Sequence, residues 1–268
     1  MATTLPSSRT VDAPRGVAIA LRGVAIGYNG EAIIEEIDLD IHQGEIFFIG
    51  GGSGSGKTTL LASLITLRQP LRGSIVLDGI EVVGADEDAL SAVRRRFGMM
   101  YQLGALFGGM TLLENVRIPL EEFTTLSNDA MDGVAHAKLG LVGLAAHAHK
   151  LPSEISGGMQ KRAAIARALA LDPSIIFLDE PSAGLDPVTS ADLDALIVAL
   201  NHMLGTTFVV ISHELASIYS IGHRLAMLDG ARKRLVALGS PAELREHSPD
   251  PWVRRFLTRT ASASQGAA

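Results

Sequence analysis

The sequence predicts an α/β fold whose core is a mostly parallel β-sheet. Short apolar runs such as IIFL (residues 175–178) and FVVI (residues 208–211) are typical of strands buried on both faces of such a sheet. Strand-like and helix-like segments alternate along much of the chain, whereas residues 103–155 have helical stretches and few strand signals. The middle of the chain is therefore predicted to be a helical insertion in an α/β core.

The first part of the core is predicted to be rich in strands. In chain order, the expected elements are strands over residues 16–30, 32–41 and 45–50, a helix over 57–67 and a strand over 73–79. After the insertion, strand and helix alternate again. The expected elements there are a strand over residues 174–180, a helix over 190–203 with Leu193, Leu196, Ile197 and Leu200 on one face, a strand over 206–212 and a helix over 213–220.

Length, charge and composition exclude several kinds of protein. The 268 residues suit one large domain or a core with an inserted subdomain. No uninterrupted apolar run approaches the ~20 residues that cross a bilayer, and the N-terminus has no apolar signal core. The absence of Cys excludes disulfides and cysteine-metal sites, and the net charge of −6 gives no support to a nucleic-acid partner. These points fit a reducing cytoplasm.

We divide the chain into three parts. A flexible N-terminus is expected over residues 1–15, and a main domain over residues 16–245. A helical subdomain is expected within that domain, at about residues 103–158, and a short C-terminal extension over residues 246–268.

The segment GGSGSGKT (Gly51–Thr58) matches a phosphate-binding loop between a strand and a helix. Glycines let backbone N–H groups curve around phosphate oxygens, and the helix N-terminus adds a partial positive charge. Lys57 is expected to reach the β- and γ-phosphates, and the Thr58 hydroxyl to coordinate Mg²⁺. The alternative is a flexible glycine turn. The candidate nucleotide-binding residues here are Gly51, Gly52, Ser53, Gly54, Ser55, Gly56, Lys57, Thr58 and Thr59.

The segment IIFLDEP (Ile175–Pro181) predicts an apolar strand that ends in two carboxylates. An acidic residue at such a strand end holds Mg²⁺ in phosphate-loop NTPases, and Asp179 is the candidate. Glu180 is then the candidate general base that orients or deprotonates the attacking water. The alternative is a solvated carboxylate pair at the end of a strand.

Three further residues are candidates because of their positions. His213 follows the strand FVVIS and is expected to contact the γ-phosphate, although a histidine there is ordinarily a capping or loop residue. Gln102 ends another short apolar strand, and its amide is a candidate contact for Mg²⁺ or the attacking water; by itself it is indistinguishable from a surface glutamine. Tyr28 is expected to stack on an adenine face, with ordinary strand-end packing as the alternative.

The segment ISGGM (Ile155–Met159) begins a predicted helix with two glycines, which are poor helix formers. Something other than helix propensity therefore places the glycines there, and the residues alone leave open what Ser156, Gly157 and Gly158 are presented to. The basic run Arg94–Arg96 is predicted to be a solvated helix end, with phosphate or lipid headgroup binding as the alternative.

In their fixed order, these segments resemble the nucleotide-binding subunits of ABC transporters. The series is Tyr28, GGSGSGKTT, Gln102, ISGGM, IIFLDEP, SAGLD and VVISH, and it covers about residues 17–245. The resemblance implies an ABC-type fold, with a RecA-like core, an antiparallel β edge and a helical subdomain. It also implies ATP and Mg²⁺ as ligands, Gln102 and His213 beside Glu180 in the catalytic site, and a loop over Ser182–Asp186 that makes Asp186 a nucleotide-site candidate.

In that family, ISGGM of one subunit faces the phosphate loop of another across a head-to-tail dimer. The resemblance thus implies that Ser156–Gly158 contact a γ-phosphate held mainly by a second copy of this chain. A chain with one phosphate loop and one ISGGM segment carries two half-sites, which a C₂ dimer completes.

A closer resemblance is to the ATPases of lipid-trafficking ABC systems, which work with MCE-type lipid-binding proteins, as in the Mla phospholipid systems. The segments QLGALFGGMTLLENV (Gln102–Val116), LPSEISGGM with its Met159, and PDPWVRRFL (Pro249–Leu257) carry it. It implies a separate transmembrane permease and a location on the cytoplasmic face of the inner membrane. The sequence also leaves room for a small regulatory partner on the helical subdomain.

Other functions stay open on the sequence. An importer of amino acids or other small polar solutes, or a cell-division ABC ATPase, would use the same nucleotide chemistry. A soluble ABC mechanoenzyme acting on DNA or ribosomes is disfavoured by the single phosphate loop, the absence of Cys and the absence of a heptad run. A binding module that does not hydrolyse ATP is disfavoured by the intact pair Asp179–Glu180.

Overall fold

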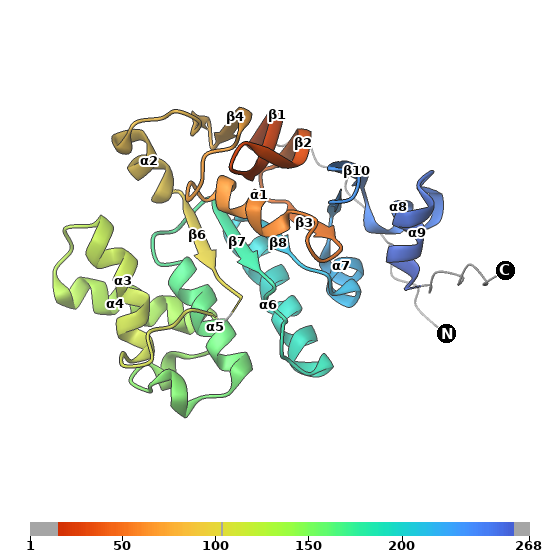
Figure 1. Cartoon of the computed structure of the whole chain (residues 1–268). Helices are drawn as coiled ribbons and strands as arrows, with labels where there is room; N and C mark the ends of the chain where they lie inside the picture. Colours follow the sequence, from red (N-terminus) through yellow and green to blue (C-terminus); the bar gives the residue numbers. More distant parts are fainter. Residues whose placement is uncertain (1–15, 103, 260–268) are drawn as a thin grey trace, which may run out of the picture.

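The computed structural model describes residues 16–102 and 104–259 (Figure 1). In this part of the chain, ten strands form one sheet in the order β5-β4-β1-β2-β10-β9-β3-β8-β7-β6. The strands are β1 (Val17–Tyr28), β2 (Glu31–His42), β3 (Ile46–Gly51), β4 (Arg72–Leu77), β5 (Ile80–Glu81), β6 (Phe97–Met100), β7 (Ile175–Asp179), β8 (Thr207–Ile211), β9 (Arg224–Asp229) and β10 (Arg234–Gly239). The predicted α/β class is confirmed.

One half of the sheet is parallel and buried. Strand β3 pairs in parallel with both β9 and β8, and β7 pairs in parallel with both β8 and β6. Every residue of β3 and β8 is buried, because helices cover both faces and leave no side for polar residues.

The other half is the expected antiparallel β edge. Strands β1 and β2 form a long hairpin, and β1 also pairs antiparallel with β4. The turn of the hairpin is Asn29–Gly30, with φ of 51° and 82°. Positive φ at both turn positions suits the right-handed twist of the strands, which is why Asn-Gly is common there. A single parallel pair, Arg234↔Glu35, joins β10 to β2 and so connects the two halves.

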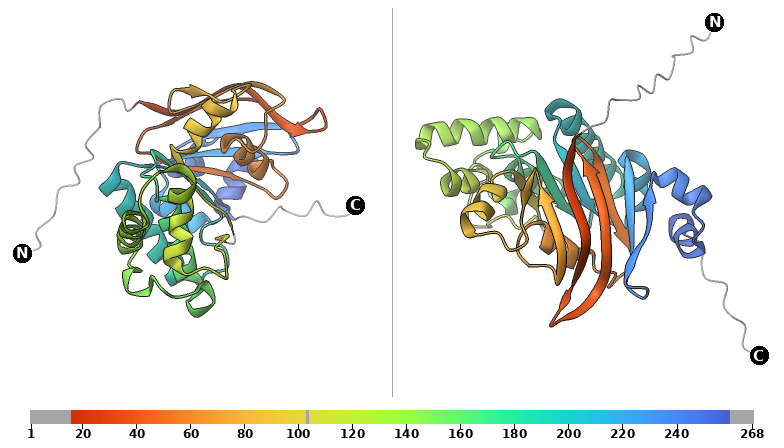
Figure 2. Two further views of the ribbon diagram at one scale, coloured as in Figure 1. Left: turned by 90° about the vertical axis from the view of Figure 1, so that its left-hand side faces the viewer. Right: turned by 90° about the horizontal axis from the view of Figure 1, so that it is seen from above.

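Nine α-helices occur in the described residues (Figure 1). They are α1 (Lys57–Leu64), α2 (Glu87–Arg94), α3 (Leu112–Phe123), α4 (Asn128–Leu141), α5 (Gly157–Ala168), α6 (Pro187–Leu204), α7 (Leu215–Ile221), α8 (Pro241–His247) and α9 (Pro251–Thr258). Helices α3 and α4 pack on α5 and form the expected helical insertion. Figure 2 shows that this insertion and the pair α8–α9 lie at opposite sides of the molecule.

Two apolar clusters make up the core. One joins the helical insertion to one face of the parallel strands and to α6, α7 and α9. The other joins the opposite face to α1 and the antiparallel edge. Helix α1 therefore lies between the two halves of the sheet, directly after the glycine run that ends β3.

Three predicted helices are wrong at one end. The helix expected over residues 190–203 begins at Pro187, because Asp186 is its N-cap. The helix expected over residues 57–67 ends at Leu64, because Thr66 has a left-handed backbone with φ of 63°. The helix expected over residues 213–220 begins at Leu215, because Glu214 is its N-cap and leaves His213 in a loop. Residues 1–15, Leu103 and 260–268, which include the expected flexible N-terminus, lie outside the described residues. The division into three parts stays a prediction.

Candidate active site

The carboxyl ends of four neighbouring parallel strands bring the predicted site residues to one edge of the sheet. The strand order there is β3-β8-β7-β6, and Ile49 and Asp179 both lie opposite Ile211 in the register. The phosphate loop follows β3, His213 follows β8, Glu180 follows β7 and Gln102 follows β6. This is the edge at which open α/β sheets bind their ligands.

The phosphate loop needs glycine at specific positions. Gly51 has φ of 145°, and a Cβ there would lie 2.4 Å from the carbonyl oxygen of Leu228 and 2.6 Å from Ser55 Oγ. Gly56, with φ of 87°, is the N-cap of α1, and no side chain caps this helix. The first N–H groups of α1 therefore stay available for an anion such as phosphate.

Lys57 lies in this loop and donates hydrogen bonds to the carbonyl oxygens of Gly51 and Gly52, both at 2.9 Å. Partial burial lowers the pKa of Lys57, and the charges of Glu180 and Asp179 oppose that shift. The ammonium group is thus close enough to both carboxylates for their charges to act on its pKa. Of the remaining candidate residues in the loop, Ser53, Gly54 and Thr58 are exposed, and Ser55 and Thr59 are buried.

Glu180 and His213 contact each other directly. Their atoms Oε1 and Nδ1 are 2.7 Å apart, and the Ser212 hydroxyl donates to Glu180 Oε2 at 3.4 Å. Glu180 has φ of 46°, and its N–H donates to the carbonyl of Ile211 at 2.8 Å. A left-handed backbone at a residue with a side chain is strained, and such strain gathers at functional sites. The side chain of Glu180 is only 12% exposed, whereas that of His213 is 68% exposed.

The surroundings of Asp179 suit a divalent cation. Burial raises the pKa of Asp179, and the neighbouring Glu180 carboxylate raises it further, while Lys161 and Lys57 act in the opposite direction. A cation held by this carboxylate would relieve that repulsion. Among the described residues, no group of three or more His, Cys, Asp or Glu side chains could hold a metal ion. Proteins usually hold Mg²⁺ by one or two carboxylates together with substrate phosphates, and Asp179 is a carboxylate that could serve in this way.

Tyr28 lies at the end of β1, beside the phosphate loop. Its hydroxyl is 3.2 Å from Thr59 Oγ1, and the Arg68 guanidinium lies over the ring at 4.0 Å from its centroid. Arg68 also donates to the carbonyl of Gly27 at 3.1 Å. Tyr28 as a whole is 46% exposed. The structure therefore places Tyr28 next to the loop, with Arg68 on one face of the ring.

Gln102 is exposed at the same edge of the sheet, and its backbone is hydrogen-bonded to a side chain of α5. Its carbonyl oxygen accepts a hydrogen bond from Lys161 Nζ. Lys161 is 7% exposed, and burial lowers its pKa while Asp179 and Glu180 oppose that shift. A buried lysine between the Gln102 backbone and the two carboxylates is a feature that the sequence analysis missed. Helical spacing could have predicted this burial. Lys161 comes three residues after Gly158 and four before Ile165, so the three residues share one face of the helix, and that face is buried.

The segment ISGGM lies beside the start of α6, on a different part of the chain from the phosphate loop. The Ser156 hydroxyl caps α5 by accepting from Met159 N at 3.3 Å. A Cβ at Gly158 would lie 2.5 Å from Thr189 Cγ2, whereas the nearest contact of a Cβ at Gly157 would be Leu185 Cδ2 at 3.9 Å. Gly158 is therefore required by packing within the chain, and Gly157 presents an open, exposed backbone.

Asp186 is the N-cap of α6. Its Oδ1 accepts hydrogen bonds from the N–H groups of Val188 and Thr189 at 3.0 and 3.1 Å. These bonds, and above all the one from the Thr189 hydroxyl, lower the pKa of the Asp186 carboxyl. The carboxylate is thus already used to begin a helix at the loop formed by Ser182–Asp186.

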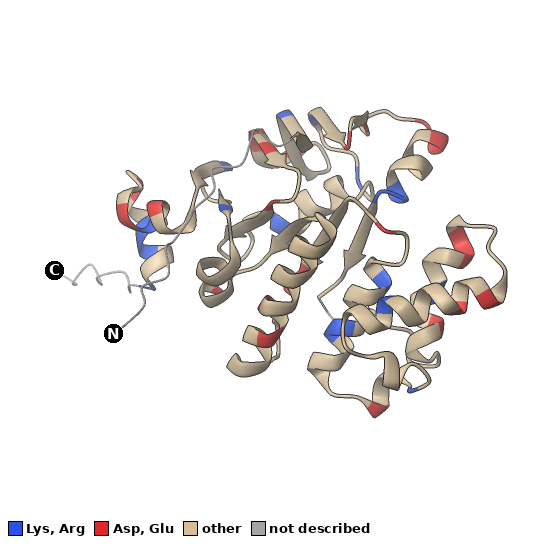
Figure 3. Ribbon diagram, turned by 180° about the vertical axis from the view of Figure 1, so that it is seen from behind, with Lys and Arg blue, Asp and Glu red and all other residues tan. Residues whose placement is uncertain are grey.

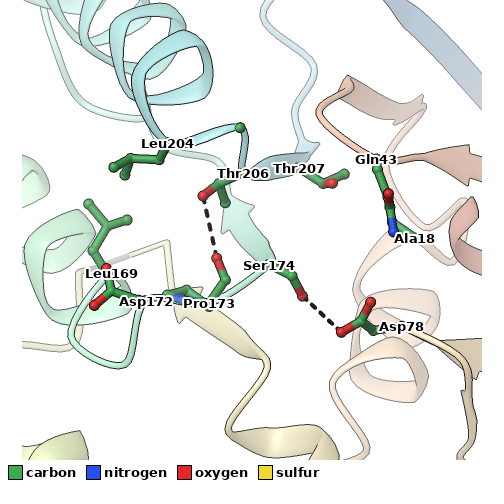
Figure 4. Close-up of a pocket in the computed structure, with 11 residues that line it drawn as sticks. Ala18, Gln43, Asp78, Leu169, Asp172, Pro173, Ser174, Leu204, Thr206 and Thr207 are labelled. Atoms are coloured by element: carbon green, nitrogen blue, oxygen red, sulfur yellow. Dashed lines mark hydrogen bonds between the residues drawn. The ribbon is translucent and has the colours of Figure 1, made fainter. Parts of the chain in front are cut away.

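A second cavity, of about 390 Å³, lies at the opposite edge of the sheet (Figure 4). Its lining includes Ser174 before β7, Thr206 before β8, and the acidic residues Asp78 and Asp172. In Figure 4, Ser174 donates to Asp78 Oδ2 at 3.4 Å, and the Thr206 hydroxyl donates to the carbonyl of Pro173 at 3.3 Å. Two carboxylates and no basic side chain in the lining make this cavity unsuited to polyphosphate.

The basic run Arg94–Arg96 ends α2 and is largely engaged within the chain. Arg94 bonds to Glu87 and Thr66, Arg95 lies 5.8 Å from the ring centroid of Phe123, and Arg96 pairs with Asp78 at 3.0 Å. Figure 3 shows Lys and Arg positions spread over several elements of the face in view. The predicted alternative of a phosphate site at this run gains no support from these contacts.

Comparisons with known proteins agree with this geometry. Residues 34–183 match the model of the ABC transporter family. The chain is 42% identical over 244 residues to the probable ribonucleotide transport ATP-binding protein mkl of Mycobacterium leprae (strain TN), covering 91% of this chain and 70% of that protein. It is 41% identical to the intermembrane phospholipid transport system ATP-binding protein MlaF of Escherichia coli (strain K12), covering 89% of this chain and 88% of that protein.

A solved structure gives the same result for the fold. The ATP-binding cassette MJ0796, in a dimeric post-hydrolysis state bound to ADP and Pi, superposes with a TM-score of 0.74 at 32% identity, covering 83% of this chain and 98% of that one. The resemblance that the sequence analysis drew from the order of the motifs is confirmed. The chain therefore belongs to the ABC transporter family and is one of its ATP-binding domains.

Proposed function

We propose that this chain is the ATP-hydrolysing subunit of a membrane transporter that moves phospholipid, and that two copies act as a head-to-tail dimer. One observation carries the catalytic part. The carboxyl edge of the parallel strands brings an uncapped helix N-terminus and Lys57 together with Asp179 and the hydrogen-bonded pair Glu180–His213. This is a polyphosphate site next to a carboxylate placed to act on water.

In this proposal, each chain binds the ATP base at Tyr28 and the phosphates in the loop Gly51–Thr59. Lys57 exchanges its bonds to loop carbonyls for the β- and γ-phosphates. Thr58, Gln102 and Asp179 would hold Mg²⁺, which supplies charge neutralisation at the phosphates when bound. Glu180 orients the attacking water and takes its proton, and His213, held by Glu180, is placed to contact the γ-phosphate.

The proposal of a dimer rests on the separation of Ser156 and Gly157 from the phosphate loop of their own chain. The open backbone at Ser156 and Gly157 lies beside the loop Ser182–Asp186 and not on the phosphate loop of the same chain. A second copy, turned head to tail, would bring this surface and Asp186 to the other copy's nucleotide. The similar cassette MJ0796 is dimeric, which supports a dimer of this chain.

The phospholipid part rests on similarity. MlaF, named for intermembrane phospholipid transport, matches along almost the whole of both chains. Met159 and the segments 102–116 and 249–257 carry the same likeness. An MCE-type lipid-binding protein, and a small regulatory subunit on the helical insertion, are the further partners proposed. A second candidate is ribonucleotide transport, or another small polar solute, which the name of the mkl relative favours.

A separate permease is proposed as the membrane partner. In the part of the chain that the structure describes, no helix has the length and apolar character to cross a bilayer. A cavity of about 250 Å³ lies between β6 and the helical insertion, lined by apolar residues such as Phe97, Tyr101 and Phe123 and by the basic residues Arg94 and Arg167. Tyr101 is 40% exposed. We assign this surface to a cytoplasmic segment of the permease, which would keep the chain peripheral on the cytoplasmic face of the inner membrane.

Glu180→Gln tests the catalytic assignment. The amide cannot accept the proton of water, so turnover should fall by about 100-fold or more. The Kd for ATP should stay close to that of the unchanged chain, and ATP should drive the variant into a dimer visible by size-exclusion chromatography. Asp192→Asn, which removes one exposed charge from α6, is the matched control and should leave turnover unchanged. Near-normal turnover in Glu180→Gln would exclude Glu180 as the base.

Purification from membranes tests the transport assignment. A multi-span permease recovered with an MCE-type protein and bound phospholipid would support lipid transport. Recovery of a periplasmic solute-binding protein instead would replace it with the solute-transport candidate.

A further inference from the structure

Helix α5 holds the backbone of the segment that carries Gln102. We define the Gln102 segment as residues 101–102 and 104–105. Lys161 Nζ donates to the carbonyl of Gln102, and Arg167 donates to the carbonyls of Gly104 at 2.9 Å and Ala105 at 2.7 Å. Three carbonyls of a short stretch are thus bonded to two cations on one helix.

The Gln102 segment needs this support because its backbone is irregular. Gly104 and Ala105 have φ of 73° and 49°, and the left-handed region is unfavourable for a residue with a Cβ such as alanine. Carbonyls turned away from the sheet in such a stretch must find donors elsewhere. Charged donors form stronger hydrogen bonds than neutral ones, so Lys161 and Arg167 are well suited to this task.

The strand before the Gln102 segment is packed against the same helix. A Cβ on Gly98 would lie 2.0 Å from the carbonyl oxygen of Ala168, so β6 and the end of α5 touch through their backbones. Strand β6, the Gln102 segment and α5 therefore form one packed unit.

Helix α5 also reaches two other places that the proposed function uses. It begins at Ser156–Gly158, the surface proposed to meet the second copy's nucleotide. Its Arg167 lines the cavity of about 250 Å³ proposed to receive the permease, together with Tyr101 of the Gln102 segment. The Lys161 bond lies between these two ends, next to Asp179 and Glu180.

We propose that Lys161 is a positioning residue: by holding the Gln102 carbonyl, with Arg167 as second anchor, it fixes the Gln102 side chain at the nucleotide and ties that placement to α5. This rests on the proposed function. Lys161 acts through Gln102 and does not itself bind ATP. Because α5 is one rigid element, a shift of α5 on contact with a second copy would move both Gln102 and the permease surface.

The test compares Lys161→Met, Lys161→Arg and Arg167→Met with Arg162→Met in the purified full-length chain. Arg162 is the next residue on α5 and is half-buried, and none of the bonds to the Gln102 segment in the described chain come from it. Hydrogen exchange over residues 97–106, the Kd for ATP, and kcat and KM for hydrolysis are measured for each.

Lys161→Met should speed exchange over residues 97–106 by about 10-fold, since a charge-assisted bond to a strained segment is lost. It should lower kcat by about 10-fold and leave the Kd for ATP within about 3-fold, because placement and not binding is affected. Lys161→Arg should recover most of both changes, Arg167→Met should also speed exchange, and Arg162→Met should change neither. Unchanged exchange in Lys161→Met, or a Kd that rises as much as kcat falls, would overturn the proposal.

A double-mutant cycle with Gln102→Ala decides whether Lys161 acts through Gln102. If it does, adding Lys161→Met to Gln102→Ala should lower kcat by less than about 2-fold, because the placed side chain is already absent. A full additional loss would overturn the positioning role. Lys161→Ala, which also removes the donor, replaces Lys161→Met in all arms if the methionine variant does not fold. If the unchanged chain hydrolyses no ATP, the proposed function fails, while the exchange measurements still judge the Lys161 bond.

Discussion

Helices α1 and α5 both begin with glycine-rich segments, yet their N-termini are built differently. The N-cap of α1 is Gly56, which has no side chain to cap the helix, and Lys57 donates to the loop carbonyls. The N-cap of α5 is Ser156, whose hydroxyl caps the helix. The start of α1 thus leaves its first N–H groups available for an anion, whereas at the start of α5 the serine hydroxyl is already bonded and Gly157 presents an open backbone.

This difference teaches what each glycine does. In the phosphate loop, Gly51 and Gly56 are required by backbone conformation, because their φ values are positive. In ISGGM, Gly158 is required by the neighbouring α6, and only Gly157 is left without a reason inside the chain. We therefore expect changes at the start of α1 to alter ATP affinity, and changes at the start of α5 to alter dimer closure or stability.

The largest effect should come from Gly157→Asp. A carboxylate there would face the γ-phosphate of the second copy, and like charges brought together across an interface cost several kcal/mol, so hydrolysis should fall by about 100-fold or more. The Kd for ATP of the monomer should not change, because the phosphate loop is intact. Analytical ultracentrifugation with ATP in the Glu180→Gln background should show a monomer. Normal closure and hydrolysis would show that Gly157 does not meet the nucleotide of the second copy.

Lys57→Ala should have the next largest effect, and this effect should be on ATP affinity and not on dimer closure. Loss of a charge-assisted bond to phosphate should weaken ATP binding by about 10- to 100-fold. Isothermal titration calorimetry measures the Kd directly, with Lys150→Ala, an exposed lysine far along the chain, as the control. An unchanged Kd would contradict the assignment of the phosphate loop.

Gly158→Ala should lower stability more than Gly157→Ala does. The new methyl group would meet Thr189 Cγ2 at 2.5 Å, and overpacking of this kind costs about 1–3 kcal/mol. The same change at Gly157 meets nothing closer than 3.9 Å and should alter the free energy of unfolding by less than about 0.5 kcal/mol. Urea unfolding of the pair separates the two roles. Gly158→Ala/Thr189→Ser, which removes the methyl group of Thr189, should recover most of the lost stability, and no recovery would contradict this cause.

Ser156→Ala should destabilise the folded chain less than Gly158→Ala does. Loss of the hydroxyl that caps α5 should lower the free energy of unfolding by about 1 kcal/mol. Ser156→Asp, which can still cap the helix, should restore stability in the same urea experiment. If it also restores ATP-dependent dimerisation, Ser156 serves its own helix and not the second copy's nucleotide.

The fold class and most of the candidate site follow from local sequence. The glycine spacing of the phosphate loop, the apolar strand that ends in Asp179 and Glu180, and the buried runs of the parallel strands each predict a feature from residues that are adjacent in the chain. Parallel strands place their carboxyl ends at one edge, so even the gathering of Lys57, Glu180, His213 and Gln102 could be predicted. Helix ends were less predictable, because Thr66 and Glu214 act through backbone conformation and capping.

Only the tertiary structure decided which side chains meet. Glu180 bonds to His213 across 33 positions of the sequence, and Lys161 bonds to Gln102 across 59. The packing of Gly158 on Thr189 and of Arg68 on Tyr28 likewise depends on how separate elements lie together. No local pattern records such contacts, since each depends on the relative placement of two elements, and that placement is set by the packing of the whole core. The sequence by itself determined the chemistry available to this protein, and the packing of α5 and α6 against the sheet decided which residues hold that chemistry in place.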